Sequence, residues 1–152
     1  MTLIATLHRD RAIPGAIEAR NATGRIGGPW ECLGKADNAK AAAHHNPSRD
    51  PLKKYGDTPT GIYTCSVGIA QANTRTFGPH PFIALAAKAG QCVRAVIEWG
   101  RTGFGLHGGD LNQIGKLRPT WGCLRVHNET MAEIHALAAE FGSITELIVS
   151  EE

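Results

Sequence analysis

Arg118-Pro-Thr-Trp-Gly-Cys-Leu-Arg-Val-His-Asn128 is the most informative segment of this chain, and Leu106-His-Gly-Gly-Asp110 lies a short distance before it. A thiol attacks an acyl carbonyl only as the thiolate, and a neighbouring imidazole can take its proton and later return it to a leaving amine. We therefore expect Cys123 to be a nucleophile and His107 to be its general base.

The residues around this pair fit the same chemistry. A catalytic histidine needs a third group to fix its tautomer, and a backbone carbonyl can do this as well as a carboxylate. Gly122, immediately before Cys123, allows a sharp turn. The amides of Gly122 and Cys123 could then point at a developing oxyanion.

His107-Gly108 followed by Thr120-x-Gly122-Cys123-Leu-Arg125-x-x-Asn128 resembles the signature of the L,D-transpeptidase catalytic domain, also called the YkuD domain. Thr58-Pro-Thr-Gly61 is similar to an upstream feature of that family, and Gly78-Pro79 matches it more loosely. The resemblance covers roughly residues 55 to 150. It is specific because it combines His, Gly, Cys, Arg and Asn in a fixed order.

The resemblance implies a mainly β fold, a β-sandwich or barrel with a helix packed near the C-terminus. It implies that Cys123 attacks the carbonyl between an L-centre and a D-residue of a peptidoglycan stem peptide. His107 would be the base, steadied by the carbonyl of Gly108. The amides of Gly122 and Cys123, with that of Trp121, would form the oxyanion hole.

Substrate-binding roles follow from the same resemblance. Arg125 would anchor a substrate carboxylate or hold the loop, and a structural salt bridge is the alternative. Thr120 would support the catalytic loop. Trp121 departs from the family, which often carries a polar or basic residue there, and would form an aromatic wall over the substrate. The acyl-enzyme would be resolved by an amine, a free D-amino acid or water, so transpeptidation, exchange and L,D-carboxypeptidase activity stay open. No cofactor or metal is expected.

The biological setting is an expectation of the same kind. The first residues, Met1 to Asp10, lack the features of a secretory signal, and no apolar run is long enough for a membrane span. We expect action in the periplasm or cell wall, reached by another secretion route or after removal of a leader. An antibacterial effector neutralised by an immunity protein is one alternative. A peptidoglycan-binding module without activity is another alternative. A zinc hydrolase that uses His107, Cys123 and a further histidine is the last.

Composition bounds the class of protein. The 152 residues fit a single domain, 1–152, that can bury its own core, and 42% hydrophobic and 20% charged residues are ordinary for a globular protein. A net charge of +2 without a basic block makes nucleic acid a poor partner. No two cysteines form a C-x-x-C pair, which disfavours a zinc ribbon or a thioredoxin motif. If Cys123 is the nucleophile, the other three cysteines, Cys32, Cys65 and Cys92, can form at most one disulfide. We interpret Cys65 and Cys92 as small buried strand residues.

Hydrophobic patterning predicts a strand-rich chain. Cys92 to Trp99 alternates most regularly. The strands expected are Leu3–His8, Ala16–Ala22, Trp30–Leu33, a strand after Gly61 that runs to Val67, Cys92–Trp99, Gly103–His107 and Ile144–Val149. Phe82 to Ala87 is ambiguous between strand and helix. Gly34 to Asp57 is predicted to be a long loop with a short helix at Asn38–His44.

One clear helix is predicted from Asn128 to Phe141. Asn128 is interpreted as its N-cap and Gly142 as the residue after its end. His127 is expected to be a solvated side chain near that cap, and Asp110 to be a solvated loop residue. The pair His44-His45 invites a metal interpretation, but adjacent histidines rarely share one ion without further ligands.

Overall fold

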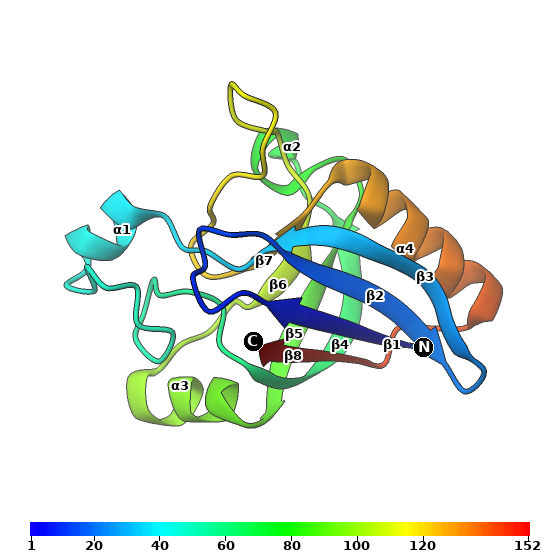
Figure 1. Cartoon of the computed structure of the whole chain (residues 1–152), viewed down its shortest axis with the longest axis horizontal. Coiled ribbons are helices and arrows are strands. Elements are labelled where there is room, and N and C mark those ends of the chain that lie inside the picture. The colour runs from blue at the N-terminus through cyan, green and yellow to red at the C-terminus, as the bar shows by residue number, and fades with distance from the viewer.

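Eight strands form a closed barrel, which confirms the expected mainly β fold (Figure 1). The computed structural model describes every residue from Met1 to Glu152. Around the barrel the strands follow the order β1-β2-β3-β7-β6-β5-β4-β8. Their bounds are β1 (Thr2–Leu7), β2 (Gly15–Asn21), β3 (Gly24–Leu33), β4 (Gly61–Ala70), β5 (Pro81–Ala89), β6 (Gly105–His107), β7 (Leu124–Val126) and β8 (Glu146–Glu151).

The first and last strands close the barrel. β1 pairs with β8 in parallel, with Leu3 opposite Leu147 and Ala5 opposite Val149. These side chains are all buried, because alternate residues of a strand point to the same face. β6 and β7 form the other parallel pair, and every other neighbouring pair is antiparallel.

Four helices lie outside the barrel: α1 (Asn38–Ala43), α2 (Thr74–Phe77), α3 (Gln91–Trp99) and α4 (Asn128–Phe141). The helix predicted near the C-terminus is confirmed as α4. It buries Met131 and Ile134 against the core, and Trp30 of β3 donates a hydrogen bond of 2.9 Å to Glu133. No helix of the chain has the length and apolar character needed to cross a membrane.

The strand predicted at Cys92–Trp99 is wrong, because this segment is α3. The buried residues are Cys92 and Ala95, spaced as on one helix face, while Ile97 is 78% exposed. Alternation of apolar residues is therefore coincidental here. Two signals favoured a helix: an Arg94–Glu98 ion pair at i,i+4, and a glycine at position 100 that ends the helix in the left-handed conformation.

Other predictions differ in detail. The ambiguous segment Phe82–Ala87 is part of β5, and the strand expected at Trp30–Leu33 begins earlier, at Gly24. The short helix expected at Asn38–His44 is α1. Cys65 and Cys92 are buried as expected, although Cys92 is helical rather than extended. None of the cysteines forms a disulfide.

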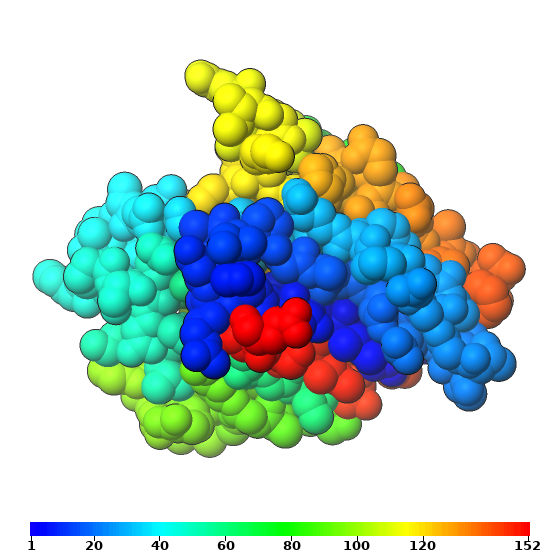
Figure 2. Space-filling view, in the orientation of Figure 1, coloured from blue at the N-terminus to red at the C-terminus, as the bar shows by residue number.

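The segment between β6 and β7 projects from the body of the molecule (Figure 2). Its outer turn is closed by a hydrogen bond of 2.8 Å from the Asn112 amide to the Lys116 carbonyl. Ile114 at the turn is 78% exposed. Both strands that flank this segment carry residues of the predicted site.

Candidate active site

The barrel brings the two predicted catalytic residues together on neighbouring strands. β6 ends at His107, β7 begins directly after Cys123, and His107 pairs with Arg125 in the parallel register. Because side chains alternate along a strand, Cys123, Arg125 and His107 share one face of this pair. All three line one cleft of about 980 Å³.

His107 is held in a single orientation. Its ring is 2% exposed, stacks on Phe82 at a centroid distance of 5.7 Å and meets the edge of Phe77 at 5.0 Å. Nδ1 lies 2.7 Å from the carbonyl oxygen of Gly108. A carbonyl can only accept, so the neutral ring carries its proton on Nδ1 and Nε2 is the bare nitrogen.

The electrostatics of His107 favour the neutral ring. Burial lowers its pKa to about 4, and the nearby Arg125 cation acts in the same direction, against the hydrogen bond to Gly108. At neutral pH the imidazole is therefore an unprotonated base.

Cys123 is half-buried on the floor of the cleft, and its sulfur lies 3.5 Å from the carbonyl oxygen of Gly103. Burial raises the pKa of its thiol to about 11, although the Gly105 backbone and the cations of Arg125 and Arg101 favour the thiolate. The resting pair is thus a neutral thiol and a neutral imidazole.

Thr120 holds the turn that presents Cys123. Its hydroxyl donates to the Cys123 carbonyl at 2.7 Å and accepts from the Gly122 amide at 3.0 Å. The predicted oxyanion role of the Gly122 amide is therefore wrong in this conformation, because that donor is already used. The amides of Trp121 and Cys123 donate no hydrogen bond within the protein.

Arg125 serves the loop after β6. The salt bridge considered as an alternative role for Arg125 is absent. Nη1 instead donates to the carbonyls of Gly108, at 2.8 Å, and Thr76, at 3.0 Å, and the buried Nε has no partner. Burial lowers the Arg125 pKa to about 10, and the Arg118 cation adds to this. Arg125 thus fixes the carbonyl that orients His107.

Asn128 is not the helix cap. The residue before α4 is His127, which makes no side-chain cap hydrogen bond but lies 3.3 Å from Glu31. Asn128 instead accepts from the Gly109 amide at 2.8 Å, and a Cβ on Gly108 would lie 2.2 Å from its Oδ1. It therefore stabilises the loop that follows His107.

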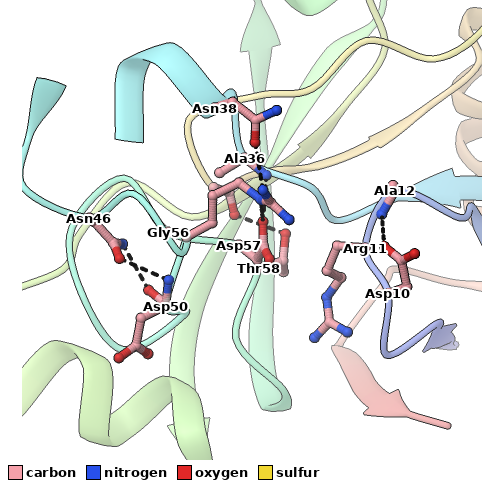
Figure 3. Close-up of polar contacts among 12 residues, drawn as sticks. Asp10, Arg11, Ala12, Ala36, Asn38, Asn46, Asp50, Gly56, Asp57 and Thr58 are labelled. Atoms are coloured by element: carbon pink, nitrogen blue, oxygen red, sulfur yellow. Dashed lines mark hydrogen bonds and ion pairs between the residues drawn. The ribbon is translucent and has the colours of Figure 1, made fainter. Parts of the chain in front are cut away.

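The predicted long loop between Gly34 and Asp57 is an ordered wall of the cleft. Figure 3 shows its internal contacts: Asn46 and Asp50 bond to each other, and Asp57 accepts from the Ala36 amide at 2.8 Å. The backbone of the loop also joins the catalytic turn, because the Thr120 amide donates to the Lys35 carbonyl at 3.1 Å.

Trp121 lies where this wall meets the catalytic turn. It is 64% exposed, with the Lys40 ammonium 4.2 Å from its ring centre and Tyr55 against its edge at 6.2 Å. His44 stacks on Tyr55 at 3.8 Å. His45, the residue after His44, has a φ of 62°.

Neither metal binding nor an orienting carboxylate is built into the site. No group of three or more His, Cys, Asp or Glu side chains is placed to hold a metal ion. Asp110 is 3.6 Å from Arg75 rather than bonded to His107. The carbonyl of Gly108 occupies the position where such a carboxylate would act.

Comparison with solved structures finds a protein of similar fold. The fold is similar to part of the structure of Bd1075 from Bdellovibrio bacteriovorus. The TM-score is 0.56 at 14% sequence identity, and the alignment covers 96% of this chain and 46% of that one. The likeness at this identity concerns the fold alone, and this chain spans less than half of the other. No family model matches the chain, and no curated protein does.

Sequence reasoning missed Arg101. It is 4% exposed and donates to the carbonyls of Pro51, of Gly56 at 3.1 Å and of Asp57 at 2.9 Å. Gly122 has a φ of 123°, and a Cβ there would lie 2.1 Å from an Arg101 nitrogen. Arg101 therefore joins the Gly34–Asp57 wall to the catalytic turn.

Sequence reasoning also missed the role of the Thr58 side chain. Thr58 is 1% exposed, and its hydroxyl donates to the Gly122 carbonyl at 3.0 Å. A buried threonine in a Thr-Pro segment was the only available signal, and its distant partner could not be inferred from it.

Proposed function

We propose that this chain is an L,D-transpeptidase-type cysteine acyltransferase of the YkuD-like fold that acts on peptidoglycan stem peptides. One observation supports this most: the residues of the resemblance, far apart in the sequence, bond to one another around Cys123 and His107. Thr58 bonds to Gly122, and Arg125 to Gly108. The likeness of the barrel to a solved structure is compatible with the proposal and adds the fold only.

Acylation begins from the neutral pair. As the stem peptide enters, the Cys123 thiol gives its proton to Nε2 of His107, and the sulfur attacks the carbonyl carbon. The amides of Trp121 and Cys123, which are free of other partners, stabilise the oxyanion. The C–N bond then breaks, and His107 returns the proton to the leaving amine.

Deacylation reverses this sequence with a new acceptor. An amine, a D-amino acid or water gives a proton to His107 and attacks the thioester, and the Cys123 sulfur leaves as the thiol. Arg125 keeps the Gly108 carbonyl in place through both steps. Because Nδ1 stays bonded to that carbonyl, the ring need not rotate between the two proton transfers.

Mass spectrometry of tetrapeptide muropeptides incubated with the protein tests this proposal. Loss of the terminal D-alanine, its exchange for an added D-amino acid, or a cross-linked product is the expected result, and a Cys123→Ala sample should give none of them. The mass of the product identifies the acceptor. Unchanged muropeptides with folded protein would reject peptidoglycan as the substrate.

The acid side of the pH profile of the reaction should be set by the protonation of His107. The base is lost when Nε2 is protonated, so kcat/KM falls as pH drops through the pKa of the free enzyme. Because burial lowers that pKa to about 4, activity should persist well below pH 6. A profile of kcat/KM from pH 3 to 9 checks this, and an acid limb near pH 6.5 would contradict it.

A further inference from the structure

Cationic side chains dominate the cleft around Cys123. Lys54, Arg101, Arg118 and Arg125 line it, against the single carboxylate of Asp37. That carboxylate is engaged as the cap of α1, accepting from the Lys40 amide at 2.8 Å. None of the four cations takes part in an ion pair. The cleft therefore carries positive charge that the protein leaves unneutralised.

The four cations divide into two kinds. Arg101 and Arg125 are buried and hold backbone carbonyls, so their part is structural. Arg118 and Lys54 retain free donors. Arg118 bonds through Nε to the Asp110 carbonyl and through Nη2 to the Arg75 carbonyl, which fixes its guanidinium while Nη1 stays unpartnered. The exposed Lys54 ammonium makes no hydrogen bond in the protein.

Arg118 and Lys54 lie at opposite ends of the cleft. Arg118 is tied to Arg75 of α2. Lys54 lies beside Gly100, the residue that ends α3, since a Cβ on that glycine would be 4.0 Å from the ammonium. Figure 1 shows α2 and α3 at opposite sides of the molecule with β6 between them. A ligand lying across Cys123 would meet a cation in each direction.

We propose that Arg118 and Lys54 are two carboxylate-binding positions flanking Cys123, which select substrates with negative charge on both sides of the attacked carbonyl. Under the proposed function, one position holds a carboxylate of the acidic donor peptide. The other holds the carboxylate of the D-amino acid that leaves or enters. This assignment of ligands rests on the proposed function, whereas the selection of anions rests on the cleft alone.

Alkylation of Cys123 by iodoacetate and by iodoacetamide tests the selection without any peptidoglycan. The reagents are similar in size and differ in charge, and peptide mapping isolates Cys123 from the buried cysteines. In the folded protein, the rate with iodoacetate divided by the rate with iodoacetamide should exceed the same ratio measured on the urea-unfolded protein. Arg118→Gln and Lys54→Gln should each lower it about threefold to tenfold at low ionic strength, with smaller effects in about 0.5 M salt. Arg118→Lys should restore most of the ratio.

Two neighbouring lysines provide matched controls. Lys53→Gln and Lys116→Gln remove the same charge from residues that do not line the cleft, and they should leave the ratio unchanged. An unchanged ratio in both test variants overturns the proposal, and so does an equal fall in the controls, which would reflect net charge alone.

Muropeptide assays on the same variants separate the two proposals. If alkylation is charge-selective but no muropeptide product forms, the anion-binding positions are supported. Peptidoglycan is then rejected as the ligand of these positions. Muropeptide products without charge-selective alkylation overturn the positions and leave the proposed function standing. A raised KM for tetrapeptide in Arg118→Gln or Lys54→Gln, with kcat nearly kept, supports both.

Discussion

Removing either Cys123 or His107 should eliminate nearly all acyl transfer, and removing both should cost little more. The thiol is neutral at rest, so attack requires proton transfer to Nε2, and neither group can complete the step alone. We expect Cys123→Ala, His107→Gln and the double variant each to lower kcat/KM by about 10³- to 10⁶-fold. The rate of D-alanine release from tetrapeptide measures this.

His127→Gln is the matched control, because His127 is near the site in sequence but faces Glu31 rather than Cys123. It should keep activity within about threefold, as expected of a substitution outside the reacting groups. Circular dichroism should show that every variant is folded. A double variant whose loss is the product of the two single losses would mean that the residues act in separate steps.

Arg101→Met should be the most destabilising single change near the site. The guanidinium supplies hydrogen bonds to three carbonyls of the Gly34–Asp57 wall, and methionine supplies none. Because buried acceptors left without donors are costly, we expect the free energy of unfolding to fall by about 3–5 kcal/mol. Urea denaturation followed by fluorescence of the tryptophans measures it.

The exposed Arg94 offers the comparison, since its only ion-pair partner is Glu98 on the same helix. Arg94→Gln should change the free energy of unfolding by less than about 0.5 kcal/mol. Arg101→Lys should recover part of the loss, because an ammonium cannot reach all three carbonyls at once. If Arg101→Met unfolds within 1 kcal/mol of the parent, the guanidinium is not what secures the wall.

The strands were predictable wherever hydrophobic alternation reflects burial on one face. In β1 the buried Leu3, Ala5 and Leu7 alternate with partly exposed residues, and in β8 Leu147 and Val149 do the same. α3 shows where this reasoning fails. Cys92, Ala95, Val96 and Trp99 also follow a helical spacing, which together with the capping glycine and the charge spacing outweighs the apparent alternation. The closure of the barrel depends on pairing between β1 and β8, which no local pattern encodes.

That Cys123 and His107 lie in one cleft was predictable from the sequence, whereas most of the contacts that hold them were not. The residue types of Cys123 and His107 and their order in the sequence are enough to suggest their chemistry. The partners of Thr58, Arg101 and Asn128 depend on long-range contacts that a local pattern does not specify. The Gly122 amide was misassigned for the same reason, because its bond to Thr120 depends on the shape of the turn.

The neutral thiol of Cys123 should also resist oxidation. Peroxides oxidise the thiolate, and a thiol whose pKa is about 11 holds only about one part in 10⁴ of that form at pH 7. An ordinary cysteine holds a few per cent. The burial that disfavours ionisation of Cys123 should thus slow its oxidation to the irreversible sulfinic and sulfonic states.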